Sequence, residues 1–517
     1  MPKFSIVTPV YNPPAAALKA CIASMRNQSF SDWEWCMVDD KSTLPHVRRI
    51  LDRAQARDPR IRVTYREQNG GIVAASQDAV DIATGEFIGL LDHDDALPPN
   101  ALEQVAKRLA TDPTIDYVYT DEDKIDEEGL HYDVFRKPGW DKERLRGQNY
   151  CCHFSVFRST LLDKVGGFRP GFDGSQDYDL ILRATEAARN VAHIPQVLYH
   201  WRCVPGSAAA EVDAKPYAYD SGRRALEDHL RRSGIDASVE MKLPGHYQYR
   251  RRSLTTRPLV SIIIPTRGDS KRVWGITTCL IVNALESILE LSTYENIEII
   301  VVNDVNPDGS SIHPFEVPQD PRISVISYSK PFNYSDKCNV GFLASHGEVV
   351  IMLNDDIQVI STDWIEQLLG HLEDPEVAMV GPMLLLADGR IQSAGHTSHP
   401  TPSHIGSGQS GDAYGMWGMY MISRSLSGLT GACVAIRRSV YEELGGFSLD
   451  FPINFNDVDF CFKVLDAGYR IVWTPMARLY HFESMTRAIG VSEEEINVLE
   501  QRWKRHFGSD VYSPSNP

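Results

Sequence analysis

Acidic residues gather at two corresponding places in the two halves of the 517-residue sequence. The segment Asp92–Asp95 reads DHDD and follows an apolar, strand-like run, and Asn354–Asp356 reads NDD and follows a similar run. Carboxylates crowded at one strand end repel one another unless a cation neutralises them, and Mg²⁺ or Mn²⁺ completed by substrate phosphates is the usual solution. Helix capping explains one such cluster easily but two at corresponding positions poorly. We therefore predict a divalent metal site at each cluster.

These clusters belong to a long internal repeat. Five segments of the first half recur in the same order in the second: FSIVTPVYN from Phe4 as VSIIIPTRG from Val260, EWCMVDDKST from Glu34 as EIIVVNDVNP from Glu298, GEFIGLLDHDD from Gly85 as GEVVIMLNDD from Gly347, VGGFRPGFDGSQDYDLILR from Val165 as LGGFSLDFPINFNDVDFCFK from Leu444, and IPQVLYHW ending at Trp201 as TPMARLYHF ending at Phe482. Copies of roughly 240 residues are far longer than solenoid repeats, so the pattern predicts two tandem domains.

The boundary between the domains is predicted where periodicity fades. Residues 243–257 are rich in turn formers and arginine, which favours domains at 1–245 and 258–517 with a linker at 246–257. The arginines Arg250, Arg251, Arg252 and Arg257 could touch anionic lipid headgroups, but ordinary linker salt bridges are favoured.

Strand-like and helical segments alternate within each copy. In the first half, strands are predicted at 5–10, 34–40 and 86–92, and helices at 17–28, 47–57 and 101–112. This alternation predicts an α/β fold with a mainly parallel sheet, in which ligands bind at the carboxyl ends of the strands. The acidic clusters sit at those ends, and residues 493–507 predict a terminal helix packed on the second domain.

Composition excludes several classes of partner and location. Fifty-two basic and sixty-nine acidic residues give 52 − 69 = −17, a charge that repels nucleic acid. Nine cysteines without a CxxC pair indicate free thiols in a reducing compartment. The N-terminus has no secretory pattern, and the apolar runs are far shorter than the roughly 18 residues that cross a bilayer. We expect a cytoplasmic protein whose membrane contact is at most peripheral.

The ordered set of motifs resembles a known family. TPVYN, VDDKST, an N-G-G element, GEFIGLLDHDD, GGF, QDYDLILR and a final YH look like an inverting glycosyltransferase of family 2 with the GT-A fold, once over about residues 3–205 and again over about 258–487. LND, TGACVAIRR and FNDVDFC in the second half are similar to the bacterial polysaccharide and O-antigen branch. The resemblance implies two tandem GT-A domains, each Rossmann-like with a mainly parallel sheet, and a C-terminal helix.

The resemblance implies a nucleotide-sugar donor, with UDP and dTDP sugars both plausible. The residues that it places at the base or ribose are Asp39, Asp40 and Asp304, with Thr8, Pro9 and Tyr11 lining the same pocket. Asn69 begins a glycine-bearing loop that approaches the nucleotide, where glycine permits close backbone contact. Asn333, Lys337 and Asn339 form its counterpart, and Lys337 could supply a cation for the diphosphate. A turn without ligand contact is the alternative interpretation of these two loops.

The resemblance also implies the metal ligands. Asp92 and Asp94, and Asn354 and Asp356 in the second copy, match the family's DxD position, which holds Mn²⁺ or Mg²⁺ and through it the diphosphate. Two histidines follow the same aromatic residue in each copy: His200 after Tyr199 and His481 after Tyr480. Their corresponding positions favour a metal or diphosphate contact over a purely structural role, and imidazole suits Mn²⁺ beside carboxylates.

Asp177 and Asp457 match the aspartate that deprotonates the acceptor hydroxyl in the family. A sugar hydroxyl is a poor nucleophile at neutral pH, so a positioned carboxylate assists as the proton leaves. One displacement at the anomeric carbon would invert its configuration. The usual preceding Glu is replaced by Gln176 and Asn456 in the two copies.

The sequence supports three functional hypotheses. The first is a bifunctional transferase that builds a bacterial surface polysaccharide (O-antigen, capsule or exopolysaccharide), with a lipid-linked acceptor bringing it to the inner membrane face. The second keeps one catalytic domain and makes the other an acceptor-binding or assembly module, and Asn354 points to the second domain as the inactive one. The third, a nucleotide-sugar-binding lectin without turnover, is disfavoured by Asp177 and Asp457.

Overall fold

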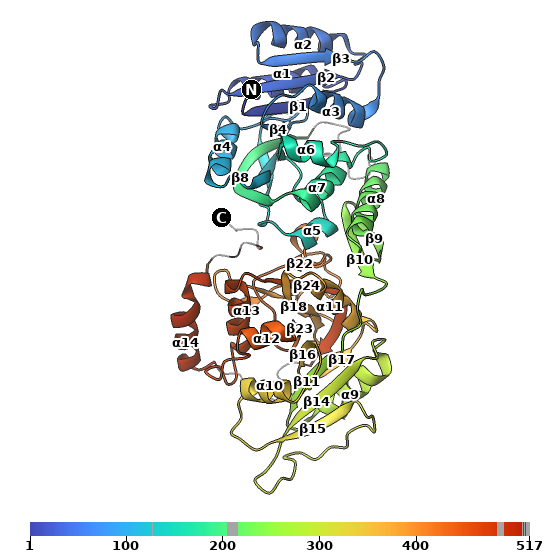
Figure 1. Ribbon diagram of the computed structural model, residues 1–517, viewed down its shortest axis with the longest axis vertical. Helices are drawn as coiled ribbons and strands as arrows, with labels where there is room; N and C mark the ends of the chain where they lie inside the picture. Colours follow the sequence, from blue (N-terminus) through green and yellow to red (C-terminus); the bar gives the residue numbers. More distant parts are fainter. Residues whose placement is uncertain (127, 204–215, 483–490, 509, 511, 513–517) are drawn as a thin grey trace. The chain divides into compact units, whose positions relative to one another are not determined.

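The computed structural model describes residues 1–126, 128–203, 216–482, 491–508, 510 and 512, and its chain divides into two compact units (Figure 1). Of the described residues, unit 1 comprises 1–235 and 239–247, and unit 2 comprises 236–238 and those from 248 to 512. Between them in the sequence lie two paired strands, β9 (Ala237–Leu243) and β10 (His246–Arg251). The domain limits given above stay a prediction.

Unit 1 is built on a mixed eight-stranded sheet. Its strands are β1 (Phe4–Val10), β2 (Trp33–Asp39), β3 (Ile61–Tyr65), β4 (Phe87–Leu90), β5 (Ile115–Ile125), β6 (His131–Phe135), β7 (Val156–Arg158) and β8 (Asn190–Arg202). Its helices are α1 (Ala15–Arg26), α2 (Pro45–Arg57), α3 (Gly71–Asp81), α4 (Ala101–Thr111), α5 (Lys142–Gly147), α6 (Ser159–Val165), α7 (Gln176–Ala187) and α8 (Pro216–Arg232). The predicted strands and helices of the first half all occur, with ends shifted by a few residues.

Unit 2 is built on a ten-stranded sheet with additional short hairpins. Its strands are β11 (Val260–Thr266), β12 (Ser270–Val273), β13 (Ile276–Cys279), β14 (Ile297–Asp304), β15 (Ile323–Tyr328), β16 (Val349–Leu353), β17 (Ile357–Val359), β18 (Val377–Leu385), β19 (Ile391–Ser393), β20 (His396–Thr397), β21 (Ser403–His404), β22 (Arg424–Ser425), β23 (Cys433–Arg437) and β24 (Arg470–His481). Its helices are α9 (Leu280–Leu291), α10 (Tyr334–Leu343), α11 (Trp364–Leu372), α12 (Arg438–Glu443), α13 (Asn456–Asp466) and α14 (Glu493–Trp503), with 3₁₀ turns η2 (Met416–Gly418) and η3 (Lys504–His506).

The two sheets share one strand order. Unit 1 runs β3-β2-β1-β4-β7-β5, with β8 beside β5, and unit 2 runs β15-β14-β11-β16-β23-β18-β24. The first four strands of each series are parallel, the fifth is antiparallel to both of its neighbours, and β5/β8 and β18/β24 are parallel again. The α/β prediction with a mainly parallel sheet is confirmed, and the carboxyl ends of β1, β2 and β4 meet at one edge, as do those of β11, β14 and β16.

Burial explains why these strands lie at the centre. All seven residues of β2 and of β11 are buried, and all five of β16. Such continuous apolar strands need helices on both faces, since both faces are removed from water. The amphipathic helices supply that cover: α4, for example, buries Leu102, Val105 and Leu109.

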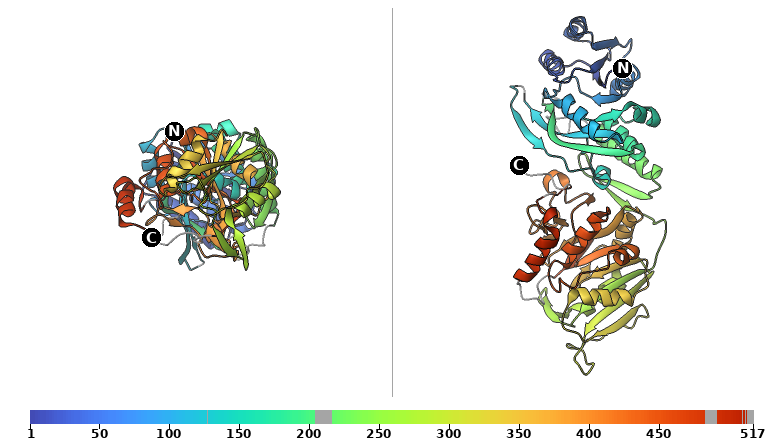
Figure 2. Two further views of the ribbon diagram at one scale, coloured as in Figure 1. Left: turned by 90° about the horizontal axis from the view of Figure 1, so that it is seen from below. Right: turned by 60° about the vertical axis from the view of Figure 1, so that its left-hand side comes forward.

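Each unit also has a late helix beside the helix that bears its proposed base. The helix α8 packs on α7 in unit 1, and α14 packs on α13 in unit 2 (Figures 1 and 2). Leu499 and Trp503 of α14 form a small buried cluster with Val458 and Phe462 of α13. The predicted terminal helix is thus confirmed, although its last residues form η3 instead.

Three smaller predictions are also answered. None of the nine cysteines forms a disulfide. Arg250, Arg251 and Arg257 pair with Asp363, Glu373 and Glu366, so three of the four linker arginines make the favoured salt bridges. None of the helices in the described residues has the length and apolar character needed to span a bilayer.

Candidate active site

The acidic loops differ in length by one residue. Strand pairing sets Phe87 beside Phe4 and Val349 beside Val260, so counting forward from the strands matches Asp92 with Asn354. On the far side, Ala96 pairs with His200 and Ile357 with His481. Counting backward from these pairs matches Asp95, not Asp94, with Asp356. The sequence comparison matched Asp94 with Asp356, and this match holds only when residues are counted forward from the preceding strands.

In unit 1 the acidic loop meets a histidine from the segment before β7. Ligand atoms of Asp92, Asp95 and His153 lie within 4.8 Å of one another. The Tyr199 hydroxyl donates to Asp95 Oδ2 over 2.5 Å and accepts from the Asp92 N–H over 3.3 Å, which holds the loop in place. Burial, followed by repulsion from Asp94, raises the pKa of Asp95 well above its usual value. A divalent cation would relieve this crowding of negative charge.

His153 comes from the segment before β7. Arg158 pairs with Phe87 as Arg437 pairs with Val349, so five residues earlier His153 corresponds to Ala432 of unit 2. His153 Nδ1 lies 3.3 Å from Glu122 Oε2, and its ring stacks on Tyr199. Burial opposes its charged form, but Glu122 raises the pKa of His153 above its ordinary value. Sequence analysis missed this residue because it lies outside every matched motif.

A row of acids lies on β5, and its middle member, Glu122, is the one that contacts His153. The pairing of β5 with β8 and of β18 with β24 shows which residues correspond in the two units. In unit 2 the positions of Asp121, Glu122 and Asp123 are occupied by Leu384, Leu385 and Leu386. Each acid has a basic partner: His193 at 2.8 Å, the buried Lys137 at 2.8 Å and His200 at 2.6 Å, respectively. The run DEDK at 121–124 was the available sequence signal, and it was overlooked because the second copy has no equivalent.

His200 lies in a different group from Asp92. Its Nδ1 donates to Asp123 Oδ1 over 2.6 Å, while His131 Nδ1 lies 2.9 Å from the other Asp123 oxygen. These three side chains form a separate group of potential ligands. The carboxylate of Asp94 lies 3.9 Å from His93 Nε2, and its carbonyl accepts from Arg202 Nε over 2.8 Å. The proposed ligand roles of Asp94 and His200 stay predictions.

Asp177 begins the base helix of unit 1. It lies in the first turn of α7, and its Oδ2 accepts a hydrogen bond from Asn149 Nδ2 over 2.9 Å. Burial raises the pKa of Asp92, His153 lowers it, and Asp94 and Asp177 raise it further. Asp177 is therefore close enough to the acidic loop to raise the pKa of Asp92, and its role as a base stays a prediction.

Unit 2 gathers Asn354, Asp356 and His481. His481 Nδ1 donates to Gln392 Oε1 over 2.7 Å, because an amide oxygen can only accept. Its Nε2 lies 3.2 Å from Asn354 Nδ2 and 3.0 Å from Asp356 Oδ1. A neutral imidazole nitrogen facing a carboxylate oxygen is repulsive unless the ring is protonated or a cation binds both, so this donor set fits a divalent ion.

The neighbouring Asp355 is strongly perturbed. Burial and the adjacent Asp356 raise the pKa of Asp355 to about 7. The Thr266 hydroxyl donates to its Oδ2 over 2.6 Å and so ties the end of β11 to the acidic loop. Crowded carboxylates in this loop again match the chemistry of a cation site.

Asp457 is linked to the acidic loop of unit 2 through hydrogen bonds. The Tyr334 hydroxyl donates to Asn354 Oδ1 over 2.9 Å and lies 3.2 Å from the Gly431 carbonyl oxygen. The Gly431 N–H donates to Asp457 Oδ2 over 2.9 Å. Asp457 and the acidic loop therefore lie at the same end of the sheet.

The Asn69 loop of unit 1 is fastened by Asp40. The Asp40 carboxylate accepts from the N–H groups of Gly70 and Gly71, each over 2.8 Å, and Asn69 Nδ2 donates to the Asp40 carbonyl over 2.9 Å. Arg66 lies 3.1 Å from the same carboxylate. Asp40 thus holds the start of α3 against the end of β2, and its predicted nucleotide contact stays a prediction.

The remaining predicted pocket residues of unit 1 differ in exposure. Thr8 is fully buried and accepts a hydrogen bond from Trp35 Nε1 over 2.8 Å, whereas Tyr11 is 48% exposed. The carbonyl of Pro9 lies 3.0 Å from His93 Nδ1. Asp39 accepts from the Ser42 N–H over 3.3 Å. The Thr8 side chain therefore lies in the core of unit 1, whereas the Tyr11 side chain is open to solvent.

In unit 2 a buried lysine occupies the predicted nucleotide side. Lys337 Nζ lies 2.9 Å from Asp304 Oδ1 and donates to the Thr266 carbonyl over 2.8 Å. Burial lowers the pKa of Lys337, and Asp304 opposes that shift. The pair joins the ends of β14 and β11 through α10.

Asn339 supports a glycine turn. Its Oδ1 accepts from the Tyr441 hydroxyl over 2.7 Å and from the Phe447 N–H over 3.2 Å, and its Nδ2 donates to the Phe447 carbonyl. Gly446, at φ +69°, must lack a Cβ because that atom would lie 2.6 Å from Asn339 Oδ1. All polar atoms of the Asn339 amide are thus engaged within unit 2, which favours the turn interpretation of this loop.

Comparison with known proteins places the chain among sugar transferases. It matches the family described as "Glycosyl transferase family 2" over residues 5–166 and 261–445. It is 41% identical to the uncharacterized protein y4gI of Sinorhizobium fredii and 34% identical to the O-antigen biosynthesis protein RfbC of Myxococcus xanthus, in both cases over 99% of this chain. The chain spans 57% and 40% of the lengths of these relatives. Among solved structures, S. aureus TarS 1-349 in complex with UDP-GlcNAc is 19% identical with a TM-score of 0.38, over 44% of this chain and 66% of that one.

Proposed function

Because the chain belongs to glycosyl transferase family 2, we propose that each of its two GT-A units transfers a sugar from a nucleotide-sugar donor to a growing bacterial surface polysaccharide. One observation carries the proposal. In each unit an acidic loop and an imidazole lie at the sheet edge that also receives the first turn of the helix bearing Asp177 or Asp457. The name of the O-antigen biosynthesis protein, 34% identical, supports the class of product.

The donor diphosphate would bind at the acidic loops. Asp92, Asp95 and His153 in unit 1, and Asp356 with His481 in unit 2, are donor sets suited to Mn²⁺ or Mg²⁺. When bound, such an ion would supply electrostatic stabilisation of the charge that develops on the leaving diphosphate. Gln392 holds His481 so that its Nε2 faces Asp356.

The acceptor would be activated by the base helices. Asp177 Oδ2 already accepts a hydrogen bond from Asn149, and Asp457 Oδ2 accepts one from the Gly431 N–H, so each carboxylate is oriented before substrate binds. A general base placed in this way accepts the hydroxyl proton as the new glycosidic bond forms, which typically contributes about 10²- to 10⁴-fold in rate. Direct displacement predicts inversion at the anomeric carbon.

The test is donor turnover by purified protein. A panel of UDP- and dTDP-sugars, with and without Mn²⁺, is assayed for release of nucleoside diphosphate, and the anomeric configuration of the product is read by NMR. We expect metal-dependent release with at least one donor and an inverted product. Donor binding without turnover would contradict the proposal and favour the lectin hypothesis, and a retained configuration would exclude the direct displacement.

A second candidate keeps one catalytic unit. Among the described residues, the three groups of potential metal ligands all lie in unit 1, and unit 2 has Asn354 where unit 1 has Asp92. This difference favours unit 1 as the catalytic unit if only one is active, with unit 2 binding the acceptor or assembling a complex. A glycan acceptor attached to lipid would bring either form of the enzyme to the membrane surface.

A further inference from the structure

A buried aspartate follows each proposed base by two residues. Asp179 on α7 is 1% exposed and Asp459 on α13 is 0% exposed. An ionised carboxylate at such a depth requires hydrogen-bonded cations, because its loss of hydration is otherwise uncompensated. Both aspartates have two basic partners, one from the same helix and one from outside it.

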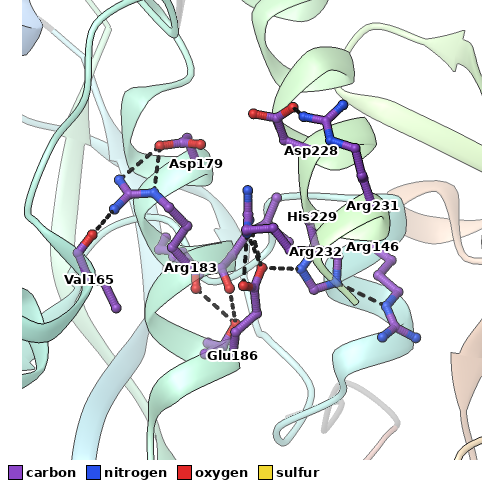
Figure 3. A network of polar contacts seen from close by, with 12 residues as sticks. Arg146, Val165, Asp179, Arg183, Glu186, Asp228, His229, Arg231 and Arg232 are labelled. Atoms are coloured by element: carbon purple, nitrogen blue, oxygen red, sulfur yellow. Dashed lines mark hydrogen bonds and ion pairs between the residues drawn. The ribbon is translucent and has the colours of Figure 1, made fainter. Parts of the chain in front are cut away.

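The partner from the same helix is equivalent in the two units. Arg183, four residues after Asp179, lies 2.9 Å from its Oδ2 and donates to the carbonyls of Val165 and Gly167 over 2.7 Å each (Figure 3). Lys463, four residues after Asp459, lies 3.2 Å from its Oδ2 and donates to the Gly446 carbonyl over 3.1 Å. Each cation therefore ties the base helix to the same Gly-Gly turn.

In unit 1 the outside partner comes from the loop that follows Gly-Gly-Phe. Arg169 on this loop lies 2.6 Å from Asp179 Oδ1 and 2.8 Å from Asp228 of α8. One guanidinium thus joins the base helix, the loop and the late helix. The same face of α8 is held to α7 by His229, whose Nδ1 lies 2.6 Å from Glu186 (Figure 3).

In unit 2 the outside partner comes from the late helix itself. Arg502 of α14 lies 2.8 Å from Asp459 Oδ1 and 2.6 Å from Asp450, which is on the loop after Gly-Gly-Phe. The same three elements are joined, but the arginine and the second aspartate have exchanged places between the loop and the late helix.

The two guanidinium groups nevertheless occupy corresponding positions. Arg169 stacks 4.3 Å from the ring of Phe172, and Arg502 stacks 5.3 Å from the ring of Phe451. Both phenylalanines stand four residues after the Phe of Gly-Gly-Phe. At the position of Arg169, unit 2 has the small Ser448, whose hydroxyl accepts from Arg502 over 3.3 Å.

We propose that this aspartate–arginine–aspartate arrangement, called here the clasp, is a positioning device that fixes the first turn of the base helix and therefore the carboxylate of Asp177 or Asp457. The residues of the clasp are Asp179, Arg169 and Asp228 in unit 1, and Asp459, Arg502 and Asp450 in unit 2. The proposal rests on the proposed function, in which these carboxylates act as bases. A displacement of about 1 Å at a reacting group can lower a rate about 10²-fold, so a helix free to shift would lose turnover before it loses donor binding.

In unit 1 the loop carries the arginine and the late helix the aspartate, whereas in unit 2 the late helix carries the arginine and the loop the aspartate. This exchange can be reproduced in unit 1 by mutation. In the full chain with unit 2 inactivated by Asp457→Asn, Arg169→Asp breaks the clasp of unit 1, and Arg169→Asp with Asp228→Arg rebuilds it in the manner of unit 2. Each protein is measured for turnover number, for affinity for the donor with Mn²⁺, and for hydrogen exchange of the peptide that covers α7. Lys107→Asp, which breaks the exposed pair with Glu103 on α4, is the matched control.

We expect the single variant to lose about 10²-fold in turnover with unchanged donor affinity, to exchange faster in α7, and to recover both properties when Asp228→Arg is added. Unchanged turnover and exchange in Arg169→Asp would overturn the proposal, as would a double variant that stays as impaired as the single one. Parallel loss of donor affinity and turnover would show a general structural role and overturn the positioning role. If the protein with intact Asp177 turns over no donor, the proposed function fails, and the exchange measurement separately decides whether the clasp holds α7.

Discussion

The two units supply the imidazole beside their acidic loops from different parts of the fold. In unit 1 it is His153, before β7, whereas unit 2 has Ala432 at that position and uses His481 at the end of β24. The histidine of unit 1 that corresponds to His481 is His200, and Asp123 holds its Nδ1. Unit 2 has Leu386 in place of Asp123, so Gln392 orients His481 instead. The two copies therefore both place an imidazole beside an acidic loop, although different positions of the fold provide it.

The largest expected effect comes from removing each base. Asp177→Asn and Asp457→Asn should each lower one transfer activity by about 10²- to 10⁴-fold, because the amide cannot accept the hydroxyl proton. Nucleoside diphosphate release with defined donors measures both activities. If one substitution abolishes all turnover and the other changes nothing, the bifunctional proposal is wrong and the single-catalytic-unit alternative stands.

The different origins of the imidazoles predict different sensitivity to histidine substitution. His153→Ala should weaken Mn²⁺ binding in the presence of UDP by about 10- to 100-fold in unit 1, and His481→Ala should do the same in unit 2. Calorimetric titration in an Asp356→Ala background isolates the site of unit 1. In that background His200→Ala is the informative comparison, because His200 lies in the group of Asp123 and His131. If His200→Ala weakened Mn²⁺ binding as much as His153→Ala, the two units would not differ in the histidine that they use.

Unit 2 should lose stability in mild acid through His396. His396 is 7% exposed and its Nε2 lies 3.1 Å from His404 Nδ1. Burial and the neighbouring His404 lower the pKa of His396 to about 4. Because the unfolded chain binds this proton near pH 6.5 and the folded unit only near pH 4, stability is complete above pH 6.5 and is lost as the pH falls through 4.

The expected loss attributable to His396 is about 2 kcal/mol at pH 5 relative to pH 7.5. Thermal unfolding followed by hydrogen exchange resolves the two units, and a His396→Phe variant should flatten the pH dependence of unit 2 over this interval. His46→Phe in unit 1, whose ring contacts the Pro13 carbonyl, serves as a control. An equally steep dependence in the His396→Phe variant would show that another group titrates.

The smallest effect tests a feature that the units share. Gly167 and Gly446 have positive φ, and a Cβ at either would collide with the amide of Gln77 or Asn339. The preceding glycines, Gly166 and Gly445, have positive φ but open space around them. Alanine should therefore cost about 1 kcal/mol at the first glycine from backbone strain and about 1 kcal/mol more at the second. Equal costs at both glycines, measured by denaturant unfolding, would show that the amide contact does not constrain the turn.

The sequence predicted the repeated architecture well because its signals are local. Buried strands such as β11 and β16 are continuous apolar runs, and the acidic loops directly follow them. The pairing of Asn354, Asp356 and His481 also followed from motif order. The one-residue difference between the loops could not be predicted, since it depends on the strand register at Ala96 and Ile357.

The contribution of His153 could not be predicted for a different reason. It has no counterpart in the second copy, so a comparison of the two halves gives it no weight. The row Asp121–Asp123 was missed in the same way, although a run of acids in a buried strand requires basic partners from elsewhere in the fold. Lys137, His193 and His200 are those partners, and the two histidines come from β8, more than 70 residues along the chain.

The late helix contributes an aspartate to the clasp of unit 1 and an arginine to the clasp of unit 2. This difference matters because the two units have the same fold. Were α14 to dock in place of α8, Arg502 would meet Arg169 beside Asp179, and in the reverse exchange Asp228 would meet Asp450 beside Asp459. Either error sets like charges against each other beside a buried aspartate, which disfavours docking of the wrong helix. Newly synthesised halves that resemble each other closely can thereby reject the wrong helix and accept their own.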